Sequence, residues 1–181
     1  MKFEDLIIDN SQTYSQKAKL LEQRLIAIRQ RNRGEILSKI DAETHRMEHI
    51  TTFRGVDFVN DSKSENVNAT YYCLEQMKSN VIWIVGGEDS LTNYADLKEV
   101  VKNKVKAIVC MSEHCEKIKQ TFNGYVPVIL ECNNMETAVR QGFYAAQKGD
   151  IVLLSTACKC DSQFDDYKQR GLAFRKAIAQ L

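Results

Sequence analysis

Apolar and polar positions alternate along residues 44–181 in a way that predicts strands separated by helices. Three continuous apolar runs are typical of strands buried on both faces, namely Val81–Val85, Val105–Met111 and Ile151–Ser155. The stretches 55–60 and 127–130 predict two further strands. Apolar residues at helical spacing predict helices over about 66–77, 93–103, 113–122, 134–147 and 167–181. We therefore expect an α/β fold, a Rossmann-like and mostly parallel sheet with helices on both faces.

The first 43 residues carry a purely helical pattern. Apolar residues recur at helical spacing from Thr13 to Gln30, Arg31–Gly34 is a stop signal, and a second short helix is expected over 35–42. We therefore divide the chain into an N-terminal helical extension, 1–43, and a main domain, 44–181. The favoured interpretation of the extension is packing on the domain or on a second copy through residues 13–40, ahead of a membrane or partner-helix role.

Composition narrows the class of protein. The chain has 181 residues, of which 44% are apolar, enough for the core of one ordinary domain. The net charge of +1 and the lack of a basic stripe argue against nucleic-acid binding. No apolar run approaches the ~20 residues of a membrane span, and the N-terminus lacks the apolar core of a signal peptide. We expect no membrane partner and a cytoplasmic location.

Six cysteines are scattered through the chain, and several fall within apolar runs. A disulfide framework suits small secreted chains, and zinc needs paired ligands at short spacing, whereas Cys158-Lys159-Cys160 is an isolated pair. Most of the cysteines are therefore interpreted as small buried hydrophobic residues, and no metal site is expected.

Three polar loops follow predicted strands, at 60–65, 86–90 and 155–164, and the carboxyl ends of parallel strands are where α/β sheets bind ligands. Asp61 suits ribose hydroxyls or, equally, the cap of the next helix. Lys63 suits a phosphate or a solvated surface position. Arg46 suits an anion, although a surface ion pair is favoured from the residue alone. Ser155 and Cys158 have no neighbouring base, so we expect no catalytic triad.

These stretches together resemble a known family. His45-Arg46, then GVDFVNDSKSEN at 55–66, GGEDS at 86–90, LLSTACKCDSQF at 153–164 and YKQRGLAF at 167–174 are similar, in unbroken order, to the motifs of the C-terminal domain of the Mur ligases. Within that family the resemblance is to the ligases that add D-glutamate to UDP-N-acetylmuramoyl-alanine in peptidoglycan synthesis. It covers about residues 44–181.

The resemblance implies an ATP-dependent amide ligation divided among three domains. The last domain would close over ATP or ADP, with Mg²⁺ held by a central domain. Arg46, Asn60 and Asp61 would contact the nucleotide, while Lys63 would face a phosphate or the incoming carboxylate. Ser155 would face the same site.

The chain also departs from the family pattern. No G-x-x-x-x-G-K-[ST] phosphate loop occurs, and residues 1–40 are too short to supply the missing domains if Met1 is the true start. Glu65 replaces a family threonine, Ser90 a lysine, Cys160 a serine and Thr156 a proline. One cation is lost and one anion gained, so D-glutamate should be repelled.

Two functions therefore remain open. The first is the C-terminal domain of a D-glutamate-adding Mur ligase, inactive alone. The second is a stand-alone, non-catalytic module that binds a nucleotide or docks on a Mur ligase.

Overall fold

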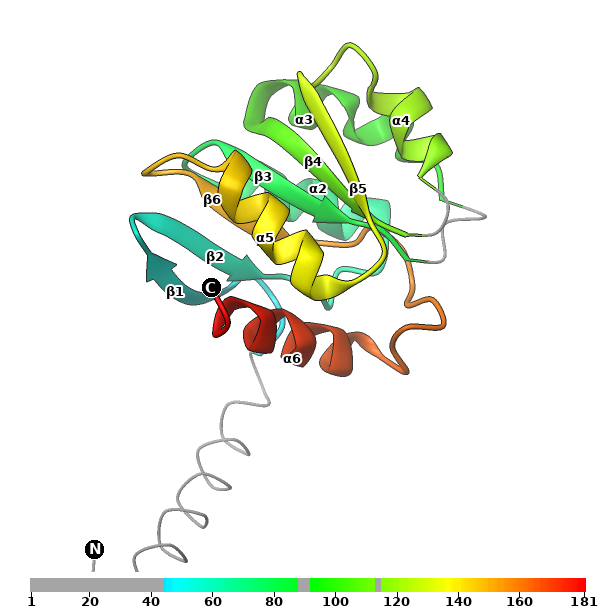
Figure 1. The fold of residues 1–181 in the computed structure, drawn as a ribbon. Coiled ribbons are helices and arrows are strands. Elements are labelled where there is room, and N and C mark those ends of the chain that lie inside the picture. Colours follow the sequence, from blue (N-terminus) through cyan, green and yellow to red (C-terminus); the bar gives the residue numbers. More distant parts are fainter. Residues whose placement is uncertain (1–43, 88–91, 113–114) are drawn as a thin grey trace, which may run out of the picture. The chain divides into compact units, whose positions relative to one another are not determined.

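The computed structural model describes residues 44–87, 92–112 and 115–181, and His45–Leu181 form one compact unit. The helices expected within residues 1–43 lie outside the described residues. Six strands form one sheet in the order β1-β2-β6-β3-β4-β5 (Figure 1). The strands are β1 (Glu48–Phe53), β2 (Val56–Asn60), β3 (Val81–Val85), β4 (Val105–Met111), β5 (Val128–Cys132) and β6 (Ile151–Leu154).

The sheet is parallel except at one edge, which confirms the expected fold class. β1 pairs antiparallel with β2, whereas β2–β6, β6–β3, β3–β4 and β4–β5 are all parallel. The sequence pattern did not separate β1 as a strand, because an edge strand with half-buried Thr and Ile positions shows no continuous apolar run.

Helices cover both faces of the sheet. One face carries α2 (Val67–Gln76), the 3₁₀ helix η2 (Tyr94–Leu97), α3 (Lys98–Lys104) and α4 (Glu116–Phe122). The other carries α5 (Met135–Ala145) and α6 (Tyr167–Ile178) (Figure 1). Alternate residues of β3 explain this division, since Trp83 packs into the first core and Ile82 and Ile84 into the second.

The helix starts are fixed by side-chain caps. Asn66, Asn134 and Asp166 each accept a hydrogen bond from the backbone N–H three residues later, at 2.8–2.9 Å. The main change from the predicted helices is at 93–103, where a 3₁₀ turn precedes a short α-helix. No helix among the described residues is long and apolar enough to cross a membrane.

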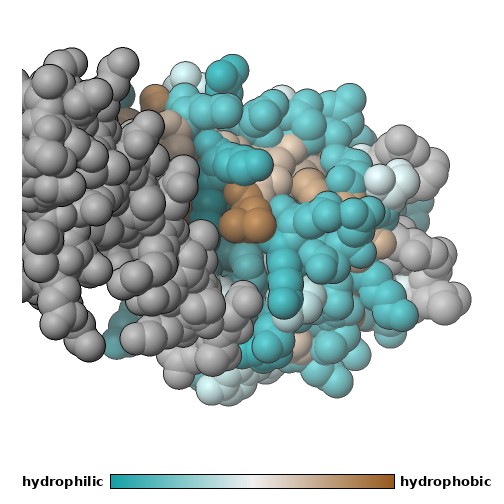
Figure 2. All heavy atoms as spheres, turned by 90° about the horizontal axis from the view of Figure 1, so that it is seen from below, coloured by the Kyte–Doolittle hydropathy of each residue, from teal (hydrophilic) through white to brown (hydrophobic). Residues whose placement is uncertain are grey.

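The part of the domain that is visible from below is mostly hydrophilic, with a few hydrophobic side chains among the polar ones (Figure 2). The inner side of α6 lies very close to the loop after β2. A Cβ atom on Gly171 would overlap the ring of His45 and lie 2.6 Å from Ser62 Oγ. Only a glycine at position 171 lets α6 approach His45 and the loop after β2 so closely.

Two helical glycines give a matched test of that approach. Gly171→Ala should lower the free energy of unfolding by about 2 kcal/mol, because the methyl group has no space. Gly142→Ala in α5 should change it by less than about 1 kcal/mol, since its Cβ would only touch Val152 at 3.0 Å and alanine favours the helix. Urea unfolding of both variants checks this, and equal effects would contradict the packing of α6.

Candidate functional site

A short segment, His45–Met47, lies beside the carboxyl end of β2 and has left-handed backbone at its first and last residues. His45 and Met47 have φ angles of 69° and 46°, which cost free energy in residues other than glycine. Three hydrogen bonds hold the segment: Met47 N donates to Asp61 Oδ1 (3.1 Å), His45 N to Glu48 Oε2 (3.2 Å), and Lys63 N to His45 O (2.9 Å). Arg46, between the two strained residues, is exposed.

Asn60 is fully buried and uses its whole side chain. Its Oδ1 accepts from Ser62 N at 3.1 Å, which sets the orientation of the amide. Its Nδ2 donates to His45 Nδ1 (2.9 Å) and to Glu48 Oε2 (3.2 Å). Because His45 Nδ1 accepts this bond, the histidine is neutral with its proton on Nε2.

Asp61 is also fully buried, and both of its oxygens are occupied. Oδ1 accepts from Met47 N, and Oδ2 accepts from Ser155 Oγ at 2.8 Å. Since the Ser155 proton is used in this bond, Thr70 Oγ1 donates to Ser155 Oγ at 2.9 Å. Asp61 therefore ties the left-handed segment to the end of β6 and to α2, and it does not cap α2, which is capped by Asn66.

The pKa of the buried Cys73 thiol responds to both Asp61 and Arg46. Burial raises the pKa of Cys73 well above its ordinary value, the Asp61 carboxylate raises it further, and the Arg46 guanidinium lowers it. Both charges thus act on the same buried sulfur. Hydrogen bonds bring Asn60, Asp61 and Ser155 together around the His45–Met47 segment, of which Arg46 is the exposed residue.

Lys63 lies at the border of this network and is exposed. Its Nζ lies 5.9 Å from the centroid of the Tyr167 ring, and His45 packs edge-on against the same ring at 5.9 Å. An ammonium group over an aromatic face is a weak attraction that leaves the charge available to an anion.

A pocket of about 550 Å³ opens at the same edge of the sheet, between the start of α2, η2 and the loop after β6. Its lining combines two carboxylates, three carboxamides and one ammonium group with small apolar side chains: Glu65, Asn66, Val67, Asn68, Thr92, Asn93, Asp96, Ala157, Cys158 and Lys159. Ser90 lies outside the described residues.

Glu65, on the pocket wall, is engaged by a buried arginine that the sequence interpretation did not single out. Arg170 in α6 is 1% exposed, and its Nη2 donates to Ser62 O (2.8 Å) and lies 3.4 Å from Glu65 Oε1. Its Nε and Nη1 have no hydrogen-bond partner among the described residues. The only signal in the sequence was the Arg170-Gly171 pair in the YKQRGLAF stretch.

Cys160 completes this second cluster, because its Sγ donates to Glu65 Oε1 at 3.8 Å. Burial raises the pKa of Cys160 to about 11; the Arg170 guanidinium lowers it and the Glu65 carboxylate raises it. The thiol is therefore protonated near neutral pH and is a poor nucleophile.

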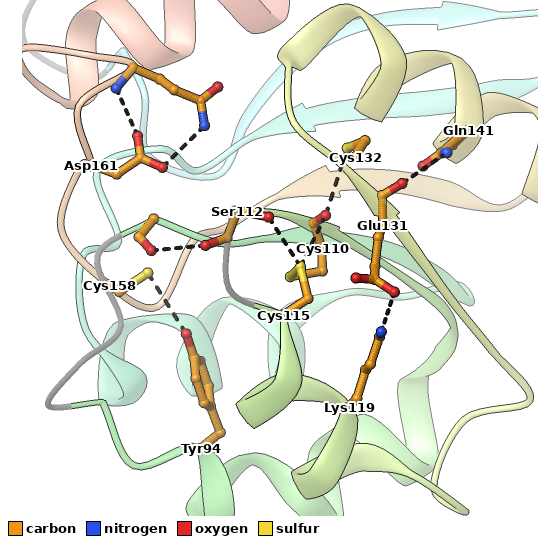
Figure 3. Close-up of a disulfide and its surroundings, with 12 residues drawn as sticks. Tyr94, Cys110, Ser112, Cys115, Lys119, Glu131, Cys132, Gln141, Cys158 and Asp161 are labelled. Carbon is orange, nitrogen blue, oxygen red and sulfur yellow. Dashed lines mark hydrogen bonds and ion pairs between the residues drawn. A yellow bond between two sulfur atoms is a disulfide. The ribbon is translucent and has the colours of Figure 1, made fainter.

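The glycine loop after β3 is held from two sides. Ser112 Oγ donates to Gly87 O at 3.4 Å, and a Cβ on Gly87 would lie 3.1 Å from Cys158 Sγ, while the Tyr94 hydroxyl contacts that same sulfur at 3.8 Å (Figure 3). The loops after β3, β4 and β6 therefore pack as one unit, which allows no side chain at Gly86 or Gly87.

Cys110 and Cys115 form a disulfide between the end of β4 and the start of α4 (Figure 3). Both cysteines are buried, but the sequence interpretation did not anticipate their pairing, which the turn after β4 allows by bringing their Cα atoms to 6.0 Å. No group of three residues able to hold a metal ion occurs in the described part of the chain.

Known proteins of one family are similar to this chain in sequence. The family profile for the Mur ligase, glutamate ligase domain, matches residues 45–158. The UDP-N-acetylmuramoylalanine–D-glutamate ligase of Christiangramia forsetii is 40% identical over 157 residues, which are 87% of this chain and 35% of that protein. The corresponding ligase of Bacteroides fragilis is 34% identical over 169 residues, 93% of this chain and 38% of the relative.

The chain thus spans little more than a third of these relatives. The 169-residue match is longer than the unit His45–Leu181, so it extends into the segment before His45.

Solved structures show the same fold. A murein peptide ligase from Psychrobacter arcticus matches 76% of this chain and 30% of its own length, with a TM-score of 0.52 and 12% identity. A bifunctional folylpolyglutamate synthase/dihydrofolate synthase from Yersinia pestis, solved with AMPPNP and manganese, matches 76% of this chain and 31% of its own length, with a TM-score of 0.50 and 16% identity. These structures show the fold alone, whereas the profile match over residues 45–158, more than half of the chain, shows that the chain belongs to the Mur ligase family and carries its glutamate ligase domain.

Proposed function

We propose that this domain forms the nucleotide-closing part of an ATP-dependent amide ligase of the D-glutamate-adding type, with Arg46 as the group that contacts ATP or ADP. The observation that carries the proposal is the His45–Met47 segment, in which two strained residues present an exposed arginine at the carboxyl edge of a parallel sheet. Strain of this kind persists only where surrounding contacts enforce it, and here Asn60 and Asp61 supply them.

In this proposal Asn60 and Asp61 act mainly by holding Arg46 in place. Both side chains are fully buried with every polar atom used, and they flank Arg46: Asp61 fixes the backbone at Met47, while Asn60 fixes the ring of His45. A guanidinium binds phosphate oxygens in a planar, two-point manner, and Lys63 adds a second positive charge nearby. Ser155 contributes through Asp61.

ATP, when bound, supplies the phosphoryl group that activates a carboxylate for attack by an amine. These 181 residues contain no phosphate-loop motif, so the phosphates and Mg²⁺ would be held by a central ligase domain, in the same protein or in a partner.

A second function, a non-catalytic binding module, is favoured by one observation. The Glu65 carboxylate on the pocket wall is already paired with Arg170, and Asp96 adds another negative charge to the pocket wall. A dicarboxylate such as D-glutamate would meet like charges there, which is unfavourable in a partly buried site. The domain would then retain the nucleotide contact without accepting that amino acid.

Nucleotide binding tests the main proposal. Arg46→Ala should raise the dissociation constant for ADP at least tenfold, because a charge-assisted hydrogen bond contributes about 1.5–3 kcal/mol. Arg140→Ala, which removes an exposed arginine from α5, is the matched control and should bind as the parent does. Calorimetric titration measures both dissociation constants. If Arg46→Ala binds ADP as tightly as Arg140→Ala does, the role of Arg46 is refuted.

Turnover tests whether these residues can catalyse the ligation by themselves, which neither function expects. The chain alone, given ATP, UDP-N-acetylmuramoyl-alanine and D-glutamate, should release no phosphate above a protein-free blank in a coupled assay. A full-length D-glutamate ligase serves as the positive control. Measurable ligation by this chain would overturn the binding-module function.

Thiol reactivity tests the charge arrangement at the pocket. Glu65→Gln removes an influence that raises the pKa of Cys160 and leaves Arg170, which lowers it. The pKa should therefore fall below about 11, so alkylation at pH 9 should become faster, because the thiolate is the reactive form.

Cys132 serves as the internal reference. Burial raises its pKa to about 11 as well, and no carboxylate contributes to that shift. Peptide mass spectrometry resolves the two rates, and an unchanged ratio of Cys160 to Cys132 labelling would show that Glu65 does not act on Cys160.

A further inference from the structure

The carboxylate of Glu48 joins three separate parts of the domain. Glu48 is the first residue of β1, and its side chain is 15% exposed. Oε2 accepts from His45 N and from Asn60 Nδ2, both at 3.2 Å, and Oε1 pairs with Arg175 Nη2. One side chain therefore connects the left-handed segment, the end of β2 and the last turn of α6.

Two neighbouring N–H groups depend on Glu48 as their hydrogen-bond acceptor. Without its carboxylate, the N–H of His45 and one N–H of the fully buried Asn60 would lose their acceptor. An unpaired buried donor is costly, so the backbone at His45, already at a φ of 69°, would shift to find another partner. Arg46 is the next residue and would move with it.

Arg175 stabilises the Glu48 carboxylate in its largely buried position. A carboxylate that is largely removed from water is stable only when a cation is paired with it. Arg175 supplies that charge from a position 127 residues away, in the last turn of α6. Its neighbour Lys176 has the same charge and the same place near the helix C-terminus but is exposed and forms no ion pair among the described residues.

We propose that Glu48 and Arg175 are positioning residues for the His45–Met47 segment, so that the C-terminal helix controls how Arg46 is presented to a nucleotide. The consequence for nucleotide affinity rests on the proposed function; the positioning of the segment does not. Neither residue touches the ligand in this account, since both act through His45 and Asn60.

The test compares Glu48→Gln and Arg175→Met with Lys176→Met, a variant that removes a cation one residue away from the pair. The first readout needs no nucleotide: hydrogen exchange of the Met47 amide, which donates to Asp61. It should become at least tenfold faster in Glu48→Gln and Arg175→Met, relative to the core amide of Ile84, and remain unchanged in Lys176→Met. Arg175→Lys, which keeps the charge, should restore most of the protection.

The second readout is ADP affinity, which should weaken about three- to tenfold in the same two variants and not in Lys176→Met. Unchanged Met47 exchange in both variants would overturn the proposal, whatever the nucleotide does. Faster Met47 exchange in a chain whose parent form binds no ADP would support the positioning role while refuting the proposed function.

Discussion

The hydrogen bonds of the Asp61 carboxylate hold the site together. One oxygen accepts a hydrogen bond from the backbone N–H of Met47. The other accepts one from Ser155, whose hydroxyl in turn accepts a hydrogen bond from Thr70. A buried carboxylate with fully committed oxygens cannot be moved without exposing unpaired groups, which makes the network stiff. The network therefore holds four parts of the domain in one geometry: the ends of β2 and β6, the start of the domain, and α2. The backbone next to the exposed Arg46 is fixed by the same contacts.

Most of the fold could be predicted from the sequence because its central strands are buried on both faces. Runs such as Val81–Val85 and Val105–Met111 leave little ambiguity between strand and loop, and both strands lie where they were expected. β1 was missed since an edge strand that is half exposed lacks such a run. Among the helices, α2 begins next to Asn66 as expected, whereas the helix expected over 93–103 is a 3₁₀ turn followed by a short α-helix.

The sequence indicated several residues of the site, but not all of them and not the contacts that they make. The polar residues after β2 and β6 were identified from their position at strand ends, and Asn60, Asp61 and Ser155 do lie together. Glu48, Arg170 and Arg175 were missed, because each has a partner 105 or 127 residues away; only the contacts of Glu48 to His45 and Asn60 are closer in sequence. Such pairings leave no pattern along the chain and become visible only when α6 packs beside β1.

The antiparallel direction of β1 also decides where the domain is attached to whatever precedes it. Glu48 pairs with Asn60, so the chain arrives at the carboxyl ends of the parallel strands, beside Arg46 and not at the opposite edge of the sheet. A parallel first strand of similar length would have placed that attachment about 17 Å away. The N-terminal entry of the domain and the exposed Arg46 therefore share one edge of the sheet.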